Sequence, residues 1–253
     1  MIIFETICVA FAMFSALPVP QVNWDKENMR YSLVAFPLIG AVSAVFCWLW
    51  HMVCGALGFP AVLQGAGWCL IPVLVTGGIH LDGYADTWDA RASHGTTEQK
   101  QEILKDPHIG TFAVLHIGIW FVAYFALWTA LPEFRFLPVL ACFCLSRTLS
   151  GLALTAFSMR PGSGLAKTFS DAAEKGRVRT ILLVFTAGLC VLLCAGGAWS
   201  MIPAAGGVFL VYRHMAEKTF GGASGDLAGW FLQTAELWML GIWVLQQFLE
   251  GRI

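Results

Sequence analysis

Long apolar runs separated by short polar stretches extend along almost the whole chain. A helix that crosses a membrane needs about 20 predominantly apolar residues. Seven segments reach or nearly reach that length: 31–56, 60–79, 109–131, 137–159, 179–199, 201–216 and 227–249. The pattern predicts an all-α, polytopic bundle of about seven transmembrane helices. Because no internal repeat or low-complexity linker divides it, we expect one integral membrane domain over residues 1–253.

The first 20 residues form a shorter apolar stretch of a different kind. They begin MIIFETICVAFAMF, with Glu5 where a secretory signal carries positive charge, and they end in Leu17-Pro18-Val19-Pro20 without a small-residue cleavage site. We therefore expect this segment to stay on the protein as a short N-terminal interfacial or re-entrant helix.

Composition agrees with a membrane protein. Of the 253 residues, 58% are hydrophobic and only 12% are charged, whereas soluble domains average about 25% charged residues. The formal net charge of -1 gives no reason to expect a nucleic-acid partner. All eight cysteines lie in apolar runs, so we interpret them as small buried hydrophobic residues.

Charged residues collect on one side of the predicted membrane. With seven spans, one side of the membrane receives most of the basic residues: Lys26, Arg30, Arg91, Lys100, Lys105, Arg160, Lys167, Lys175, Arg177, Arg179, Arg213 and Lys218. The opposite side receives only Arg135 and Arg252. The positive-inside rule assigns the side with most of the basic residues to the cytoplasm. Most aspartates lie there too. Polar chemistry gathered on one face favours a membrane-embedded enzyme over a transporter, which carries ionisable groups at the midplane of several helices.

Two charged residues lie inside predicted spans. Arg147 occurs in CFCLSRTLSGLAL and Glu236 in FLQTAELWML. A charge at the centre of a membrane helix costs about 2.5 to 3.5 kcal/mol even on insertion scales, so both side chains should be paired, hydrated or functional. Two interpretations stay open: the residues pair with each other, or they line a cavity that reaches into the bundle from the cytoplasmic side.

Three aspartates follow the second span in the sequence TGGIHLDGYADTWDARASHG. Asp82, Asp86 and Asp89 are four and three residues apart, and these positions share one face of a helix continuing from the span. Three carboxylates on one face repel one another unless a cation lies between them. Oxygen-only ligands suit Mg²⁺, with Mn²⁺ as an alternative, so we predict a metal site there.

Two further loops on the same side are suited to binding anions. RPGSGLAK, from Arg160 to Lys167, combines flexible backbone with two cations, and FGGASGD opens the last helix. Backbone N–H groups at a glycine-preceded helix N-terminus can hold phosphate. The second loop supplies the candidates Gly221, Gly222, Ser224, Gly225 and Asp226.

Together these features indicate metal-assisted phosphoryl transfer. Acidic residues would hold a divalent ion that bridges phosphates, and arginines would neutralise developing charge. The chain has no GxxxxGK[ST] sequence, so we do not expect an ordinary ATPase. The leaving group would then be a nucleotide.

The motifs resemble those of the cobalamin-5'-phosphate synthase family, also called adenosylcobinamide-GDP ribazoletransferase. The resemblance starts from TGGIHLDGYADTWDA and includes LPVP, AFPLIGAV, ILKDPHIGTFAVL, SRTLSG, MRPGSGLAKTF and FGGASGDLAG, in that order over nearly the whole chain. It departs from the usual pattern at Ala90, Pro107, Ala113 and Ser224, which leaves every proposed ligand in place.

The resemblance implies a reaction late in vitamin B12 biosynthesis. A hydroxyl of α-ribazole, or of its 5'-phosphate, attacks the phosphate on the aminopropanol arm of adenosylcobinamide-GDP, and GMP leaves. It also implies Mg²⁺ dependence and a bacterial cytoplasmic (inner) membrane location. We further expect contact with membrane lipid and assembly as a homo-oligomer or with other corrinoid enzymes.

The residues that match the family's motifs receive roles by the same resemblance. Asp82 and Asp86 are expected to bind the metal, and Asp89 to be a third ligand or the base that takes the hydroxyl proton. Asp106 and His80 are the other candidates for that base. Arg147, Arg160 and Lys167 would contact phosphates, and the loop at 221–226 would hold nucleotide or ribazole.

Two alternatives belong to other classes. A CDP-alcohol phosphotransferase of lipid synthesis also sets aspartates at a membrane boundary, but Asp86 stands where that family's pattern requires arginine. A transporter or scaffold would need its ionisable groups at the midplane, where only Arg147 and Glu236 are found.

Overall fold

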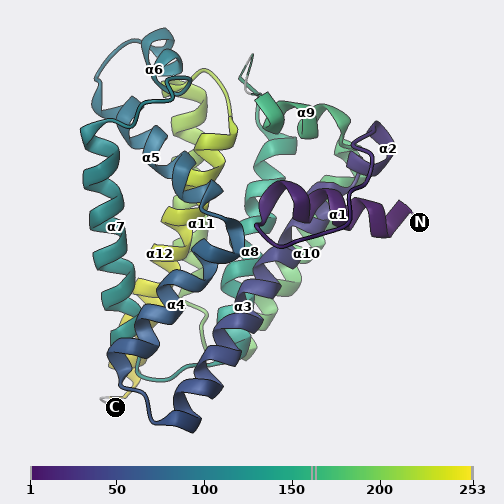
Figure 1. Ribbon diagram of the computed structural model, residues 1–253. Helices are drawn as coiled ribbons and strands as arrows, with labels where there is room; N and C mark the ends of the chain where they lie inside the picture. The colour runs from purple at the N-terminus through teal and green to yellow at the C-terminus, as the bar shows by residue number, and fades with distance from the viewer. Residues whose placement is uncertain (1, 161, 163, 252–253) are drawn as a thin grey trace.

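The computed structural model describes residues 2–160, 162 and 164–251, and over these residues the chain is helical (Figure 1). Among them the only strand-like pairing is a single bridge between Met159 and Ala223. The all-α prediction is therefore confirmed. Arg252 and two residues of the predicted anion loop, Pro161 and Ser163, lie outside the described residues.

The helices follow the predicted apolar segments closely. Shorter helices lie between them, and the full order is α1 (Ile2–Phe14), α2 (Lys26–Met29), α3 (Ser32–Leu57), α4 (Ala61–Thr76), α5 (Ile79–Ala92), α6 (Thr97–Ile103), α7 (Thr111–Ala130), α8 (Phe136–Ala156), α9 (Gly164–Ala172), α10 (Lys175–Ala195), α11 (Met201–Thr219) and α12 (Gly225–Glu250).

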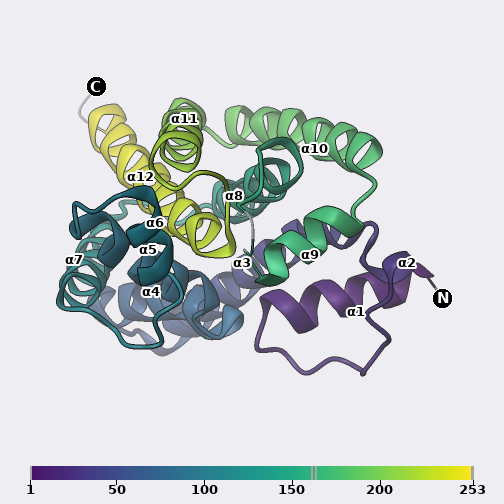
Figure 2. The same ribbon diagram turned by 90° about the horizontal axis from the view of Figure 1, so that it is seen from above.

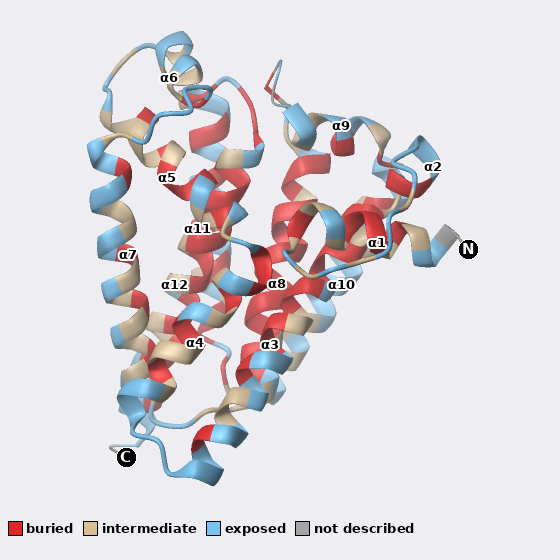
Figure 3. Ribbon diagram, in the orientation of Figure 1, coloured by how far each residue is buried: buried red, intermediate tan, exposed pale blue. Residues whose placement is uncertain are grey.

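Helix α8 forms the centre of the bundle. In its most apolar window 83% of the residues are buried, whereas the corresponding windows of α7 and α10 are 22% and 17% buried (Figure 3). Close backbone approach keeps α3 against α8, because a Cβ added to Gly40 would lie 2.4 Å from the Phe143 carbonyl oxygen. The apolar outer faces of α7 and α10 are suited to lipid.

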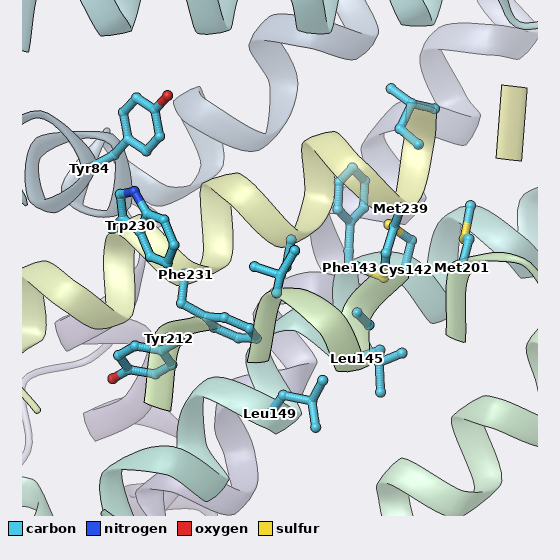
Figure 4. Packing of buried hydrophobic residues seen from close by; sticks show 14 of the residues in the cluster. Tyr84, Cys142, Phe143, Leu145, Leu149, Met201, Tyr212, Trp230, Phe231 and Met239 are labelled. Carbon is cyan, nitrogen blue, oxygen red and sulfur yellow. The ribbon is translucent and has the colours of Figure 1, made fainter. Parts of the chain in front are cut away.

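Aromatic side chains fill much of the interior between α8, α11 and α12. Tyr212 and Phe231 stack with ring centroids 5.1 Å apart, close to Leu149 (Figure 4). Of the eight cysteines, all free, six are buried as expected. Cys190 is only partly buried and Cys194 is exposed, because both lie on α10, which packs on the bundle by one face only.

Over the residues that the structure describes, four helices are long and apolar enough to cross a membrane: α3, α7, α8 and α10. The count becomes five if the bent pair α4 and α5 is one span. The chain is thus a polytopic membrane protein by length and composition, and the predicted number of seven crossings exceeds the number that these criteria give.

A sharp bend separates the second apolar segment from the aspartates. Gly77 and Gly78 both have positive φ, 64° and 80°, a region that suits glycine and ends the helix. Helix α5 leaves α4 at 92°. The expectation that the aspartates continue the helix of the second span was therefore wrong. They belong to a separate polar helix, which follows the apolar span and lies outside it.

The N-terminal segment forms a helix, as predicted, and lies across the bundle beside α9 (Figure 2). Phe14 of α1 packs on Phe169 of α9, with ring centroids 5.7 Å apart, and on Phe36 of α3 at 4.3 Å. After α1 ends, the Ala16 amide donates to the Val75 carbonyl at 2.9 Å. These contacts bring α1 to the same end of the molecule as α5 and α9.

Candidate active site

The site is built on a crossing of α5 and α12 at which backbones touch. A Cβ added to Gly83 would lie 2.7 Å from the Asp226 Cα, and one added to Gly229 would lie 2.7 Å from the His80 carbonyl oxygen. Only glycine permits this separation. The crossing places the first turn of α12, with Asp226, directly beside the stretch of α5 that carries Asp82 and Asp86.

Asp86 lies among other carboxylates. Burial raises its pKa, and the negative charges of Asp82, Asp226 and Asp89 raise it further, to about 7. The Asp86 carboxyl is therefore near half-protonation at neutral pH without a cation beside it. Clustered carboxylates with a raised pKa are typical of functional sites.

Arg160 provides the positive charge next to these carboxylates. Its side chain is only 3% exposed, and its Nη2 lies 3.9 Å from Asp226 Oδ2. Two of its other nitrogens, Nε and Nη1, are buried and find no hydrogen-bond partner among the described residues. A buried guanidinium with unused donors is suited to an anionic ligand.

Backbone pairing fixes Arg160 to the glycine-rich loop. The Arg160 amide donates to the Ala223 carbonyl at 2.9 Å, and the Ala223 amide donates to the Ser158 carbonyl at 2.8 Å. Gly222, at φ 145°, leaves no room for a Cβ, which would lie 2.5 Å from the Arg160 nitrogen. The two predicted anion-binding loops thus form one structure.

A cavity of about 330 Å³ lies where Asp82, Asp226 and Arg160 meet, and Asp86 is not among its lining residues. One wall is polar and the other is apolar, the apolar wall coming mainly from α1, α3 and α9. The polar lining includes His80, Asp82, Lys105, Arg160 and Asp226, and the apolar lining includes Met13, Phe14, Phe36, Leu165 and Phe169. A cavity with these two walls suits a ligand with a charged group and a flat apolar group.

His80 is buried at this cavity and its Nε2 has no partner among the described residues. Burial, and then the charge of Arg147, lowers the His80 pKa to about 3. The imidazole is thus neutral at physiological pH. With so low a pKa it is a poor general base, and it is better suited to hydrogen bonding with a ligand.

Asp89, predicted to be a metal ligand or base, is occupied elsewhere. Its carboxylate accepts from the Gly110 amide at 2.6 Å and from the Ala113 amide at 2.8 Å, at the start of α7. A carboxylate at a helix N-terminus satisfies free N–H groups and the helix dipole. In the structure Asp89 therefore holds the start of α7 in place. Ala113, one of the positions that differ from the family's usual pattern, takes part in this contact through its amide.

Arg147 is not brought to the cavity. Its guanidinium pairs with Glu236 at 2.5 Å, and the two side chains are 1% and 2% exposed. Glu236 also accepts from the Ser146 hydroxyl at 2.8 Å. Of the two interpretations, the structure shows pairing. The expected phosphate contact of Arg147 finds no support in this arrangement, because its charge is paired with Glu236 inside the bundle.

Two more predicted residues lie at the surface. Lys167 pairs with Asp171 one helical turn away, and Asp106 accepts from the amide and ring of His108. Neither side chain lines the 330 Å³ cavity. Their expected roles in phosphate contact and proton transfer have no support in this arrangement.

Some residues of the glycine-rich loop line the cavity, and others only stabilise the turn before α12. Gly225 and Asp226 line the cavity, whereas the Ser224 hydroxyl caps α12 by accepting from the Leu227 amide at 3.3 Å. Gly221 has positive φ, 70°, and lies beside Gln101. These residues shape the turn that sets Asp226 beside α5.

Sequence reasoning missed Lys105 and the apolar wall. Lys105 follows α6 and lines the cavity, while its neighbour Asp106 was chosen because it belongs to the ILKDPHIG motif. The pattern of polar and apolar residues could not show which of these two neighbours faces the cavity. Phe14 and Phe169 look like ordinary core residues in the sequence, and only the packing of α1 on α9 brings them to the site.

The carboxylate oxygens suit a hard divalent cation. A cation bound there would reduce the repulsion among the carboxylates that raises the Asp86 pKa. In the described part of the chain, however, no three Asp, Glu, His or Cys side chains are grouped so as to hold a metal ion. The carboxylates are gathered on rigid helices but do not yet surround one point.

The fold and the cavity define a polytopic membrane protein with a polar site suited to a phosphate-bearing ligand. The chain belongs to the cobalamin-5-phosphate synthase family, whose model matches residues 6–244. A protein of Lachnoclostridium phytofermentans is 38% identical over 249 residues, covering 95% of this chain and 93% of its own.

Other relatives carry the same name. A Pseudomonas putida protein is 33% identical over 236 residues, covering 90% of this chain and 94% of its own, and a Clostridium perfringens protein is 29% identical over 262 residues, covering 95% and 99%. All three are named adenosylcobinamide-GDP ribazoletransferase. The family is one of transferases in cobalamin biosynthesis. No solved structure matches the chain.

Proposed function

We propose that this chain is an adenosylcobinamide-GDP ribazoletransferase that joins adenosylcobinamide-GDP to α-ribazole or α-ribazole 5'-phosphate and releases GMP. The observation that carries the proposal is the cavity in which Arg160, Asp82 and Asp226 meet, built from segments inside the matched region. Family membership favours this hypothesis over a lipid phosphotransferase or a transporter.

The diphosphate of adenosylcobinamide-GDP is the group that fits Arg160. Nε and Nη1 of Arg160 are buried donors without partners among the described residues, and a guanidinium matches phosphate oxygens in a planar, bidentate way. Lys105 lines the same cavity and adds a second cation. The two cations would offset the charge that develops on the departing GMP.

Mg²⁺ would be held by Asp82 and Asp86 of α5 together with Asp226 of α12, with Mn²⁺ as an alternative. This set replaces Asp89, which caps α7. The backbone contact at Gly83 holds the two helices that carry these carboxylates against each other. A bound divalent ion polarises the phosphate that is attacked.

The apolar wall of the cavity would receive the flat lower base of α-ribazole. Phe14, Phe36 and Phe169 provide the aromatic surface, and stacking or edge contacts with such rings are favourable. The neutral His80 would hydrogen bond to the nucleoside. In the reaction the ribazole oxygen forms a bond to the attacked phosphorus, the bond from that phosphorus to the GMP oxygen breaks, GMP leaves, and the hydroxyl proton passes to water.

We also propose seven crossings, with the cavity facing the cytoplasm of a bacterial cell across its inner membrane. The positions of the basic residues support this orientation. Helices α6 and α9 lie at one end of the molecule, and the last turn of α12 lies toward the other (Figure 1). A cytoplasmic opening would admit large, water-soluble corrinoid and nucleoside substrates.

The test is GMP release by purified protein in detergent, with adenosylcobinamide-GDP and α-ribazole, measured with and without Mg²⁺. We expect metal-dependent release that Asp82→Asn and Asp226→Asn each lower by about 100-fold or more, in the range found when one charge-stabilising group is lost from a site. Asp171→Asn is the matched control, because this exposed aspartate pairs with Lys167 outside the cavity.

Folded wild-type protein that releases no GMP would refute the activity. Release without any divalent ion would refute the metal site alone. Activity of Asp226→Asn equal to that of the control would exclude α12 from the ligand set and return Asp89 to it.

A further inference from the structure

A second, separate groove lies on the outside of the bundle between α5, α11 and α12. It has a volume of about 640 Å³, and its lining includes Trp88, Arg91, Gly207, Val211, Trp230 and Trp238. We call it the outer groove. None of its residues lines the 330 Å³ cavity, so nothing in the proposed reaction uses it.

The outer groove is apolar along most of its length and carries a cation at one end. Arg91, at the end of α5, lies with its guanidinium carbon 4.6 Å from the ring centre of Trp88 and 6.0 Å from that of Trp230. Among the described residues its side chain makes no ion pair and no hydrogen bond to a protein group. A partly exposed guanidinium beside two indole rings, with donors that no protein group uses, can bind an anion.

Further polar atoms along the outer groove also lack partners. Trp230 is 3% exposed, and its indole Nε1 has no hydrogen-bond partner in the described part of the chain. Trp88 Nε1 and Thr234 Oγ1, from two other lining residues, also have no hydrogen-bond partner among the described residues. These three atoms are covered by protein, so Arg91 is the polar group that the outer groove offers to a ligand.

The floor of the outer groove is open and its length suits an acyl chain. A Cβ added to Gly207 would meet nothing within 4 Å. Trp230 and Ile242, the first and last lining residues on α12, are separated by about 18 Å of helix at 1.5 Å per residue. One leaflet of a bilayer is about 15 Å of hydrocarbon, half of the core thickness.

We propose that the outer groove binds one anionic phospholipid, with its phosphate at Arg91 and an acyl chain along α11 and α12. Charge and shape both select this occupant. The cation lies at the end of the groove nearest the polar loops, and the rest of the lining is apolar apart from Ser200 and Thr234. Aromatic residues beside a cation are typical of the level at which lipid headgroups lie.

The experiment is native mass spectrometry of the full-length protein, delipidated in detergent and offered phosphatidylglycerol or phosphatidylcholine at equal concentration. We expect the wild type to retain one phosphatidylglycerol with about fivefold preference, the effect of one basic side chain near an anionic lipid. Arg91→Gln should abolish the preference. Gly207→Leu, which fills open space in a helix, should abolish retention of both lipids.

Arg213→Gln is the matched control, because Arg213 is an exposed cation on α11 that already pairs with Glu217. It should behave as the wild type does. Unchanged preference in Arg91→Gln, or retained lipid in Gly207→Leu, would overturn the proposal. If inorganic phosphate alone displaced the bound lipid, the groove would be a phosphate site. If Gly207→Leu lost dimers, the groove would be an interface between copies of the chain. Either result would overturn a lipid site. Thermal unfolding of each variant establishes that it is folded.

Discussion

Replacing Gly83 by alanine tests whether the contact between α5 and α12 sets the geometry of the active site. The added Cβ would lie 2.7 Å from the Asp226 Cα and 2.8 Å from the Asp226 carbonyl oxygen. Both are backbone atoms, so no side-chain rotation relieves the overlap. Moving from 2.7 Å to the 3.4 Å at which ordinary contact begins requires the helices to separate by about 0.7 Å.

That separation moves Asp226 away from Asp82 and Asp86, which flank the crossing on α5. Misplacing catalytic groups by about 1 Å can cost about 100-fold in rate. We therefore expect kcat for GMP release to fall by about 10- to 100-fold in Gly83→Ala. Overpacking of this kind costs about 1 to 3 kcal/mol of stability, which leaves folded protein to assay.

The assay compares kcat, Mg²⁺ affinity and thermal unfolding of Gly83→Ala with those of Gly118→Ala. Gly118 lies in α7, where an added Cβ meets nothing within 4 Å, so this control should keep full activity and gain slightly from helix propensity. Gly83→Ala with wild-type kcat and Mg²⁺ affinity would show that the close crossing has no part in the chemistry.

Three further predictions address single groups. Arg147→Met should destabilise the protein by about 3 to 5 kcal/mol in thermal unfolding, because it leaves Glu236 buried and unpaired; Arg147→Met combined with Glu236→Leu should recover stability and retain GMP release, and loss of activity in that folded double variant would restore a phosphate role to Arg147. Asp89→Ala should lower stability by about 1 kcal/mol through loss of its bonds to the α7 amides, with Mg²⁺ affinity unchanged; a large loss of affinity would return Asp89 to the metal site. Because the Asp86 pKa is about 7, a proton competes with the cation below that pH, so Mg²⁺ affinity measured by calorimetry should fall by up to about tenfold per pH unit on acidification; an affinity independent of pH between about 8 and 6 would exclude Asp86 as a ligand.

The helices could be predicted because long apolar runs allow few other structures. The segment 31–56 became Ser32–Leu57 and 109–131 became Thr111–Ala130. Gly58, with positive φ, ends the first helix, and Pro132 follows the end of the second. The bend at Gly77 and Gly78 was not predicted. Glycines are common inside membrane helices, and only their positive φ angles show that these two end one.

The site could be predicted in part, for a related reason. Spacing along one helix identified Asp82 and Asp86 as neighbours, but it also selected Asp89, whose carboxylate turns toward α7 instead. Asp226 was chosen as part of a loop, with no indication that it faces Asp82. Such a contact depends on the backbone approach at Gly83, and no periodicity in the sequence records which helices cross there.

The crossing of α5 and α12 also determines when the site can exist during synthesis. Asp82 and Asp86 are made early, but Asp226 and Gly229 belong to α12, which the ribosome adds only after the eleven preceding helices, α1 to α11. Until α12 is inserted, α5 carries clustered negative charge with neither Arg160 nor the glycine-rich loop packed against it. The proposed site is therefore incomplete in a chain that still lacks α12.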